Sequence, residues 1–110
     1  MTRRELIDLC LTFLGAYEDY PFDETTPVIR HLLNKKTFAL IVDNPELAVN
    51  LKCEPMQAEE FRKQFEGCTP GYHMSKKHWN TVLANGDVPY DMLVNMIAHS
   101  HALTAPKNKK

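Results

Sequence analysis

The chain has 110 residues, of which 44% are hydrophobic and 25% are charged, and its formal net charge is -1. This length fits one domain, and the apolar content is too high for an intrinsically disordered chain. Because the charges nearly balance, the composition is not that of a nonspecific nucleic-acid coat. We expect a single domain over residues 1–105, followed by a basic tail, residues 106–110, that frays.

An amphipathic helix is predicted over Thr2–Leu14. Thr2 and Glu5 match the T-x-x-E capping box, and Gly15 suits the end of the helix. Residues 16–27, which follow, are acidic and rich in turn formers, with room for one short extended piece. One face of the helix collects the apolar side chains Leu6, Leu9, Cys10, Phe13 and Leu14.

Three strands are predicted next, over residues 28–33, 37–42 and 47–53, with turns at 34–36 and 43–46 between them. Turns this short favour antiparallel pairing of consecutive strands. The middle strand is nearly all apolar, as expected in the centre of a sheet. The third strand alternates with a period of two, so one of its faces should be buried. Its other face, expected to contact water, carries Ala48, Asn50 and Lys52.

The second half of the chain predicts a helix over 55–66, strands around 68–74 and 79–83, and a last helix that opens after Val88. Residues 75–78 connect the two strands. The order is therefore helix, three strands, helix, two strands, helix. Runs of strands separated by helices predict an α+β domain of two layers, in which an antiparallel sheet packs against the helices.

The cysteines Cys10, Cys53 and Cys68 form no CxxC pair, so we interpret them as free thiols rather than as a zinc or redox site. No apolar run approaches the about 20 residues of a membrane-spanning helix. Glu5 and Asp8 lie where a signal peptide would need its apolar core. We therefore expect a cytoplasmic protein that does not contact a membrane.

Charge is distributed unevenly along the chain. Residues 1–29 carry six acidic and two basic side chains, whereas residues 30–80 carry eight basic and six acidic ones. Two basic pairs, Lys35–Lys36 and Lys76–Lys77, lie at predicted turns, from which long side chains can reach phosphates. The alternative is that lysines occupy these turns because turns are solvated and sheet edges need protection from aggregation.

The segment over residues 69–81 combines aromatic, histidine and lysine side chains, a pattern that can stack on bases and neutralise phosphate. A tryptophan more often packs against a sheet, so we expect Trp79 to be at least half buried. A third interpretation is a small-molecule cleft formed by Tyr72, His73, His78 and Trp79.

Two further clusters of side chains are candidate sites of chemistry. His73 and His78 could share a metal ion across a turn, but the spacing places no third ligand. The acidic residues of the loop near residue 20 could bind a cation or act as acid and base, but no nucleophile accompanies them. We therefore expect no enzyme activity, no catalytic residue, no metal and no cofactor. The acidic cluster consists of Glu18, Asp19, Asp23 and Glu24.

The sequence resembles the MmcQ/YjbR family of small bacterial proteins. The strongest match is PGYHMSKKHWNTV, residues 70–82. The segments 19–22 (DYPF), 36–41 (KTFALI), 51–55 (LKCEP) and 88–89 (VP) match as well, so the resemblance covers nearly the whole chain.

The resemblance implies an α+β fold similar to that of secretion chaperones. Members of the family are described as DNA-binding proteins that grip the duplex with two β-hairpin wings. The alternative is a protein-interaction or homodimerising module with no nucleic-acid role. The DNA-binding positions that the resemblance implies here are Lys35, Lys36, Lys76, Lys77 and His78, with Lys52 and His73 nearby.

Overall fold

The computed structural model describes residues 1–71 and 74–107, so Tyr72, His73 and the last three residues of the predicted tail lie outside the described residues. The first half of the chain forms α1 (Arg3–Leu11), β1 (Ala16–Asp19), β2 (Val28–His31), β3 (Thr37–Asp43) and β4 (Leu47–Lys52). The second half forms α2 (Pro55–Gln64), β5 (Cys68–Pro70), β6 (Trp79–Leu83) and α3 (Tyr90–Thr104).

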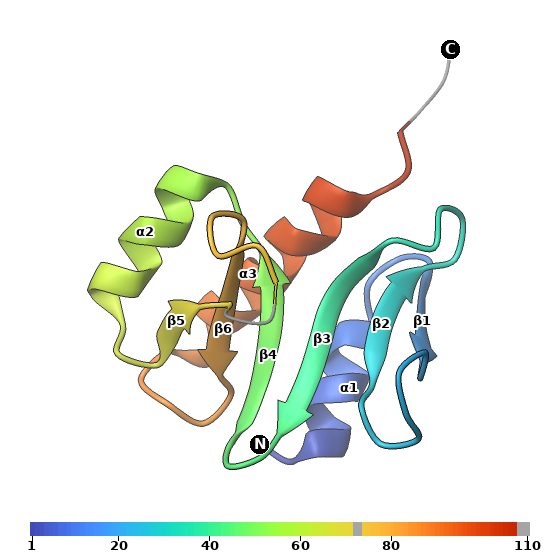
Figure 1. Cartoon of the computed structure of the whole chain (residues 1–110), viewed down its shortest axis with the longest axis horizontal. Coiled ribbons are helices and arrows are strands. Elements are labelled where there is room, and N and C mark those ends of the chain that lie inside the picture. The colour runs from blue at the N-terminus through green and yellow to red at the C-terminus, as the bar shows by residue number, and fades with distance from the viewer. Residues whose placement is uncertain (72–73, 108–110) are drawn as a thin grey trace.

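The strands of the described residues form one antiparallel sheet in the order β1-β2-β3-β4-β6-β5. Helices α1 and α3 lie behind the sheet and α2 packs on β5 and β6, as Figure 1 shows. The predicted α+β architecture of two layers is confirmed. None of the helices in the described ranges combines the length and hydropathy needed to cross a membrane.

Helix α1 begins where the capping box predicts. The Thr2 hydroxyl accepts the N–H of Glu5, and the Glu5 carboxylate accepts the N–H of Thr2. The helix ends at Leu11, three residues earlier than predicted, and Gly15 then adopts a positive φ of 72° that favours glycine. This left-handed residue turns the chain directly into β1.

The predicted strand order was wrong at one place, because β1 forms within the acidic segment that we expected to be mostly turn. Its residues pair with β2 from Ala16 opposite His31 to Asp19 opposite Val28. Its two carboxylates are accommodated by ion pairs, Glu18 with Arg4 at 3.0 Å and Asp19 with Arg30 at 2.9 Å. The observed order is therefore α-β-β-β-β-α-β-β-α.

Several element ends also differ from the prediction. Strand β2 ends at His31, because the N–H of Lys35 donates to the carbonyl of His31 and closes a turn. Strand β5 ends at Pro70 rather than Met74, since proline cannot donate to a ladder and the N–H of Met74 instead donates to the carbonyl of Gly71. Helix α2 ends two residues earlier than the predicted residue 66.

The prediction of a solvent-exposed face on β4 was wrong for two of its three residues. Ala48 and Asn50 are each 3% exposed, and only Lys52 is partly exposed. Strand β4 lies between β3 and β6, where Ala48 pairs with Leu83 and Asn50 pairs with Thr81. Asn50 is satisfied there, since its Oδ1 accepts the Thr81 hydroxyl at 2.5 Å.

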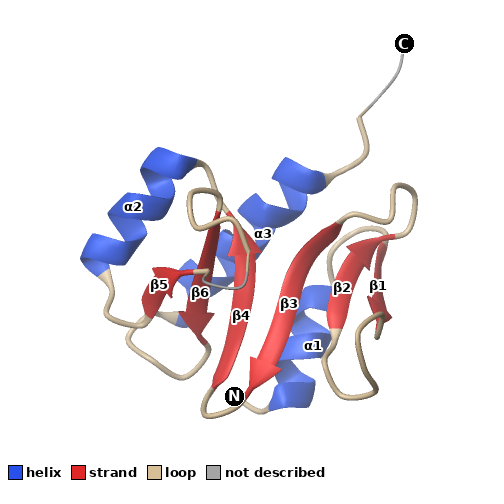
Figure 2. Ribbon diagram, in the orientation of Figure 1, coloured by secondary structure: helices blue, strands red, loops and turns tan. Residues whose placement is uncertain are grey.

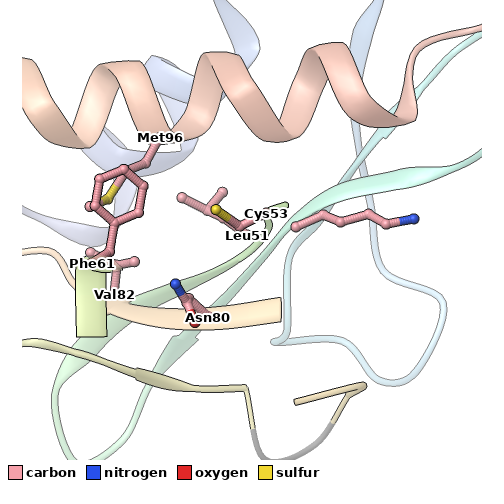
Figure 3. A pocket seen from close by; sticks show the side chains of 7 residues that line it. Leu51, Cys53, Phe61, Asn80, Val82 and Met96 are labelled. Atoms are coloured by element: carbon pink, nitrogen blue, oxygen red, sulfur yellow. The ribbon is translucent and has the colours of Figure 1, made fainter. Parts of the chain in front are cut away.

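The core lies between the sheet and the helices. Figure 3 shows Phe61 of α2 and Met96 of α3 close together beside Val82. The cavity at this point has a volume of about 10 Å³, which is enough for one water molecule at most. It is a packing gap, not a ligand site. All three cysteines are free, as predicted, and all three are buried.

Candidate nucleic-acid interface

The antiparallel register gathers the candidate basic side chains at one end of the sheet. Strand β2 ends and β3 begins at this end, and Lys35–Lys36 lie in the connection between them. Strand β4 also ends here, with Lys52 opposite Trp79, the first residue of β6. Lys76, Lys77 and His78 immediately precede Trp79. We call this set, Lys35, Lys36, Lys52, Lys76, Lys77 and His78, the basic end; the seventh candidate, His73, lies outside the described residues.

The β2–β3 connection holds its lysines in a defined turn. Lys35 has a positive φ of 63°, and its carbonyl accepts a hydrogen bond from Arg30 Nε at 2.8 Å. Its ammonium nitrogen lies 5.3 Å from the centroid of the Tyr17 ring, within the range of a cation–π contact. The side chain of Lys36 is exposed, so it can reach a ligand without breaking a contact with Tyr17.

Asn34 fixes this connection to the end of α3. Its side-chain Nδ2 donates to the carbonyl of Thr104 at 2.9 Å, and its Oδ1 accepts the N–H of Lys36 at 3.0 Å. The connection is therefore attached to the end of α3, which lies on this side of the molecule (Figure 1). Lys107, three residues beyond α3, lines the same hollow as Leu32 and Leu33.

Lys52 is held at the junction of the sheet and α3. Its N–H donates to Ser100 Oγ at 2.9 Å, and Ser100 Oγ donates in turn to the carbonyl of Phe38 at 2.6 Å. Ser100 is fully buried and provides the polar contact between α3 and the two central strands. The backbone of Lys52 thus has a fixed position, while its side chain remains partly exposed.

Arg62 of α2 organises the segment that carries the second lysine pair. Its guanidinium donates to Asn80 Oδ1 at 2.6 Å, to the carbonyl of Trp79 at 3.3 Å and to the carbonyl of Lys76. This role of Arg62 was not predicted from the sequence. A single arginine on a helix gives no local signal that its partners lie on a strand 17 and 18 residues away.

The chain just before β6 is fixed at several further points. The carbonyl of His78 accepts the N–H of Cys53 at 2.7 Å, which joins this segment to the end of β4. Gly71 lies so close to Trp79 that an added Cβ would approach its Cβ to 3.0 Å. Trp79 is mostly buried, as predicted. Two of the four residues of the predicted small-molecule cleft, Tyr72 and His73, lie outside the described residues.

The acidic cluster has structural partners rather than the geometry of a cation site. The pKa of Glu18 is lowered, mainly by its hydrogen bonds with Arg4 and Tyr20. The carboxylate of Asp23 accepts the N–H groups of Thr25 and Thr26 at 2.8 and 2.7 Å, which lowers its pKa. In the part of the chain that the structure describes, no three His, Cys, Asp or Glu side chains lie close enough to hold a metal ion.

A pair of histidines beside the basic end was also missed from the sequence. His31 Nε2 lies 2.8 Å from the Thr104 hydroxyl, and His101 Nε2 donates to the carbonyl of Leu14 at 2.8 Å. The two imidazole rings lie 4.5 Å apart, centroid to centroid. Burial, together with the neighbouring His101, lowers the pKa of His31. The pair joins the end of α3 to β2 and to the turn that precedes β1.

Comparisons with known proteins agree with this fold. The family model described as YjbR matches residues 11–103. The Bacillus subtilis protein YyaQ is 30% identical over 94% of this chain and 98% of its own length, and the Escherichia coli K12 protein YjbR is 31% identical over 92% and 85%.

Solved structures extend the likeness to three dimensions. A Pseudomonas syringae crystal structure aligns with a TM-score of 0.87 and 31% identity over 96% of this chain and all of that one. A Deinococcus radiodurans structure with the domain DUF419 aligns with a TM-score of 0.82 and 33% identity over 93% of this chain and 77% of that one. The resemblance seen in the sequence is thereby confirmed, and the chain belongs to the YjbR family.

Proposed function

We propose that this protein is a nonenzymatic nucleic-acid-binding module that contacts the phosphate backbone of a duplex through the basic end. One observation carries the proposal: the register brings lysines from three separate segments, residues 32–36, 52 and 74–78, to the same end of the sheet. Phosphate contacts by lysine give affinity without reading sequence. The proposal therefore predicts binding that depends on salt and varies little with sequence.

The two basic segments correspond to the wings that the family resemblance implies, although they differ in form. Residues 32–36 close a hairpin between β2 and β3. The second segment is attached to strand β5 of only three residues, so its shape depends on Arg62 and on the contact with the end of β4. The two segments can contact the duplex on both sides of one groove only if their positions relative to each other are fixed.

Fluorescence anisotropy with labelled duplex and single-stranded DNA tests the proposal. If four lysines each neutralise a phosphate, affinity should fall about 100-fold between about 50 and 200 mM salt. The variants Lys36→Glu and Lys77→Glu should each bind more weakly, with the salt slope reduced by about 1. Lys63→Glu is the matched control, since this exposed lysine of α2 gives the same change in net charge away from the basic end.

Two results would contradict the proposal. One is the absence of binding to either DNA at the lower salt concentration. The other is an equal loss of affinity in Lys63→Glu and Lys77→Glu, which would mean that overall charge matters and the basic end does not.

A further inference from the structure

Exposed apolar side chains gather at the two ends of strand β1. Of the eight large apolar side chains that are exposed in the described ranges, five lie beside this strand. Leu14, Leu32 and Leu33, which are 89%, 56% and 84% exposed, lie where β1 starts, and Tyr20 and Phe22, which are 38% and 70% exposed, follow its end. Such clustering is typical of an interaction surface rather than of singly scattered apolar residues.

At the start of β1 the leucines surround a hollow of about 320 Å³. His31 and His101 lie in its lining, together with the chain after α3. Among the described residues that line the hollow, Lys107 is the charged one, and Lys35 and Lys36 follow Leu33 by two and three residues. We call this hollow the leucine groove, and its surroundings are basic.

At the other end of β1 the chain presents the opposite chemistry. Phe22 lies between Asp19 and the pair Asp23–Glu24, so an exposed aromatic ring is accompanied by carboxylates. Tyr20 donates its hydroxyl to Glu18 at 2.5 Å, which fixes the ring beside the strand. We call residues 20–24 the acidic loop. This acidic loop and the basic leucine groove are complementary surfaces, and this one chain carries both.

Strand β1 itself is free to pair on one side. It is an edge strand, and in the described part of the chain no helix lies beyond it, whereas α2 packs beside β5 at the opposite edge (Figure 2). Half of the backbone groups of an edge strand point away from the sheet and can bind a further strand. The carboxylates of Glu18 and Asp19 do not prevent this by repulsion, because both are neutralised by ion pairs with arginine.

We propose that two copies of this chain associate by antiparallel pairing of their β1 strands, with the acidic loop of each copy seated in the leucine groove of the other. Antiparallel pairing about a two-fold axis places the start of one strand beside the end of the other, so both contacts form at once. If the two-fold axis passes through Tyr17, the two Glu18 side chains do not lie opposite each other. The same register places Leu14 of one copy opposite Tyr20 of the other. Since β1 has four residues, the apolar side chains supply most of the affinity.

This association extends the interaction-module alternative and does not rest on nucleic-acid binding. Phe22 lies outside the basic end, so Phe22→Asp should weaken self-association, and at protein concentrations below the dimer dissociation constant it should leave DNA affinity unchanged. Lys77 lies outside β1, the acidic loop and the leucine groove, so Lys77→Glu should weaken DNA binding and leave self-association unchanged. The failure of one proposal is therefore distinguishable from the failure of the other.

Sedimentation equilibrium of the full chain, from about 5 to 500 μM, tests the proposal. We expect a reversible shift from 12.7 kDa to twice that mass, with a dissociation constant in the micromolar range. Phe22→Asp and Leu33→Asp should weaken association at least tenfold. Met56→Asp and Tyr90→Asp are matched controls at exposed apolar side chains distant from β1, 84% and 61% exposed, and should leave it unchanged. Circular dichroism checks that each variant is folded.

Two additional experiments test the geometry, a charge swap and a disulfide cross-link. Glu24→Lys and Lys36→Glu should each weaken the dimer, and the double variant should recover affinity. Tyr17→Cys should form an intermolecular disulfide on mild oxidation, whereas Thr69→Cys, on the opposite edge strand β5, should not. A monomer throughout the concentration range, or a dimer that is equally stable in Phe22→Asp and Met56→Asp, would overturn the proposal.

Discussion

Replacement of Arg62 by methionine tests the view that one guanidinium holds the second basic segment in place. The change keeps an unbranched, apolar stem and removes the hydrogen bonds to Asn80 Oδ1 and to the carbonyls of Trp79 and Lys76. Hydrogen bonds from a charged donor contribute about 1.5–3 kcal/mol each when shielded from water. Because the site is only partly buried, we expect the free energy of unfolding to fall by about 2–4 kcal/mol in total.

Urea unfolding followed by the fluorescence of Trp79, the single tryptophan, measures this loss directly. Lys63→Met, at the adjacent exposed position, should change the free energy of unfolding by less than about 0.5 kcal/mol. Arg62→Lys keeps the charge but lacks the planar fork, so it should recover less than half of the loss. If Arg62→Met were as stable as Lys63→Met, the segment would be positioned by other contacts and our reasoning would be refuted.

Three other predictions concern the buried polar groups and thiols. Burial lowers the pKa of His31 below its usual 6.5, so on acidification the unfolded chain binds a proton at His31 before the folded chain does. The free energy of unfolding should therefore keep its full value above about pH 6.5 and decrease below it. Urea unfolding at about pH 7.5 and 5.5 should show a smaller decrease for His31→Gln than for the natural chain. Ser100→Ala removes the hydroxyl partner of the buried Phe38 carbonyl and of the partly buried Lys52 N–H, so the free energy of unfolding should fall by about 1–3 kcal/mol. An unchanged midpoint in thermal or urea unfolding would count against the role of this hydroxyl. Burial raises the pKa of Cys10 to about 12 and of Cys68 to about 11, so a thiol reagent at about pH 8 should modify both only after unfolding, and rapid labelling of the native protein would contradict their burial.

Local signals predicted much of the fold. The Thr2 capping box marked the true start of α1, and β6 has the bounds that were predicted for it. The consecutive hairpins of β2, β3 and β4 followed from short turns between apolar runs. These features depend on residues close together in the sequence, which is why patterns of spacing reveal them.

Features that depend on distant partners could not be predicted in this way. The sequence allowed a short extended piece in residues 16–27 but did not place β1, because its acidic residues are accommodated by Arg4 and Arg30, which come from 14 and 11 residues away. The contact of His101 with Leu14 joins residues 87 apart in the chain. The lysine pairs were identified from their turns, but their position at one end of the sheet follows from the insertion of β6 beside β4, which the order of elements does not specify.

The most direct test of the central claim is a titration of the ¹⁵N-labelled protein with a short DNA duplex at about 50 mM salt, with each backbone amide followed by NMR. The basic end predicts that shift changes concentrate in residues 32–36, 52–53 and 74–79 and disappear as salt is raised. Shift changes confined to the opposite end of the sheet, at residues 43–46 and 84–88, or no changes at all, would contradict the proposed interface.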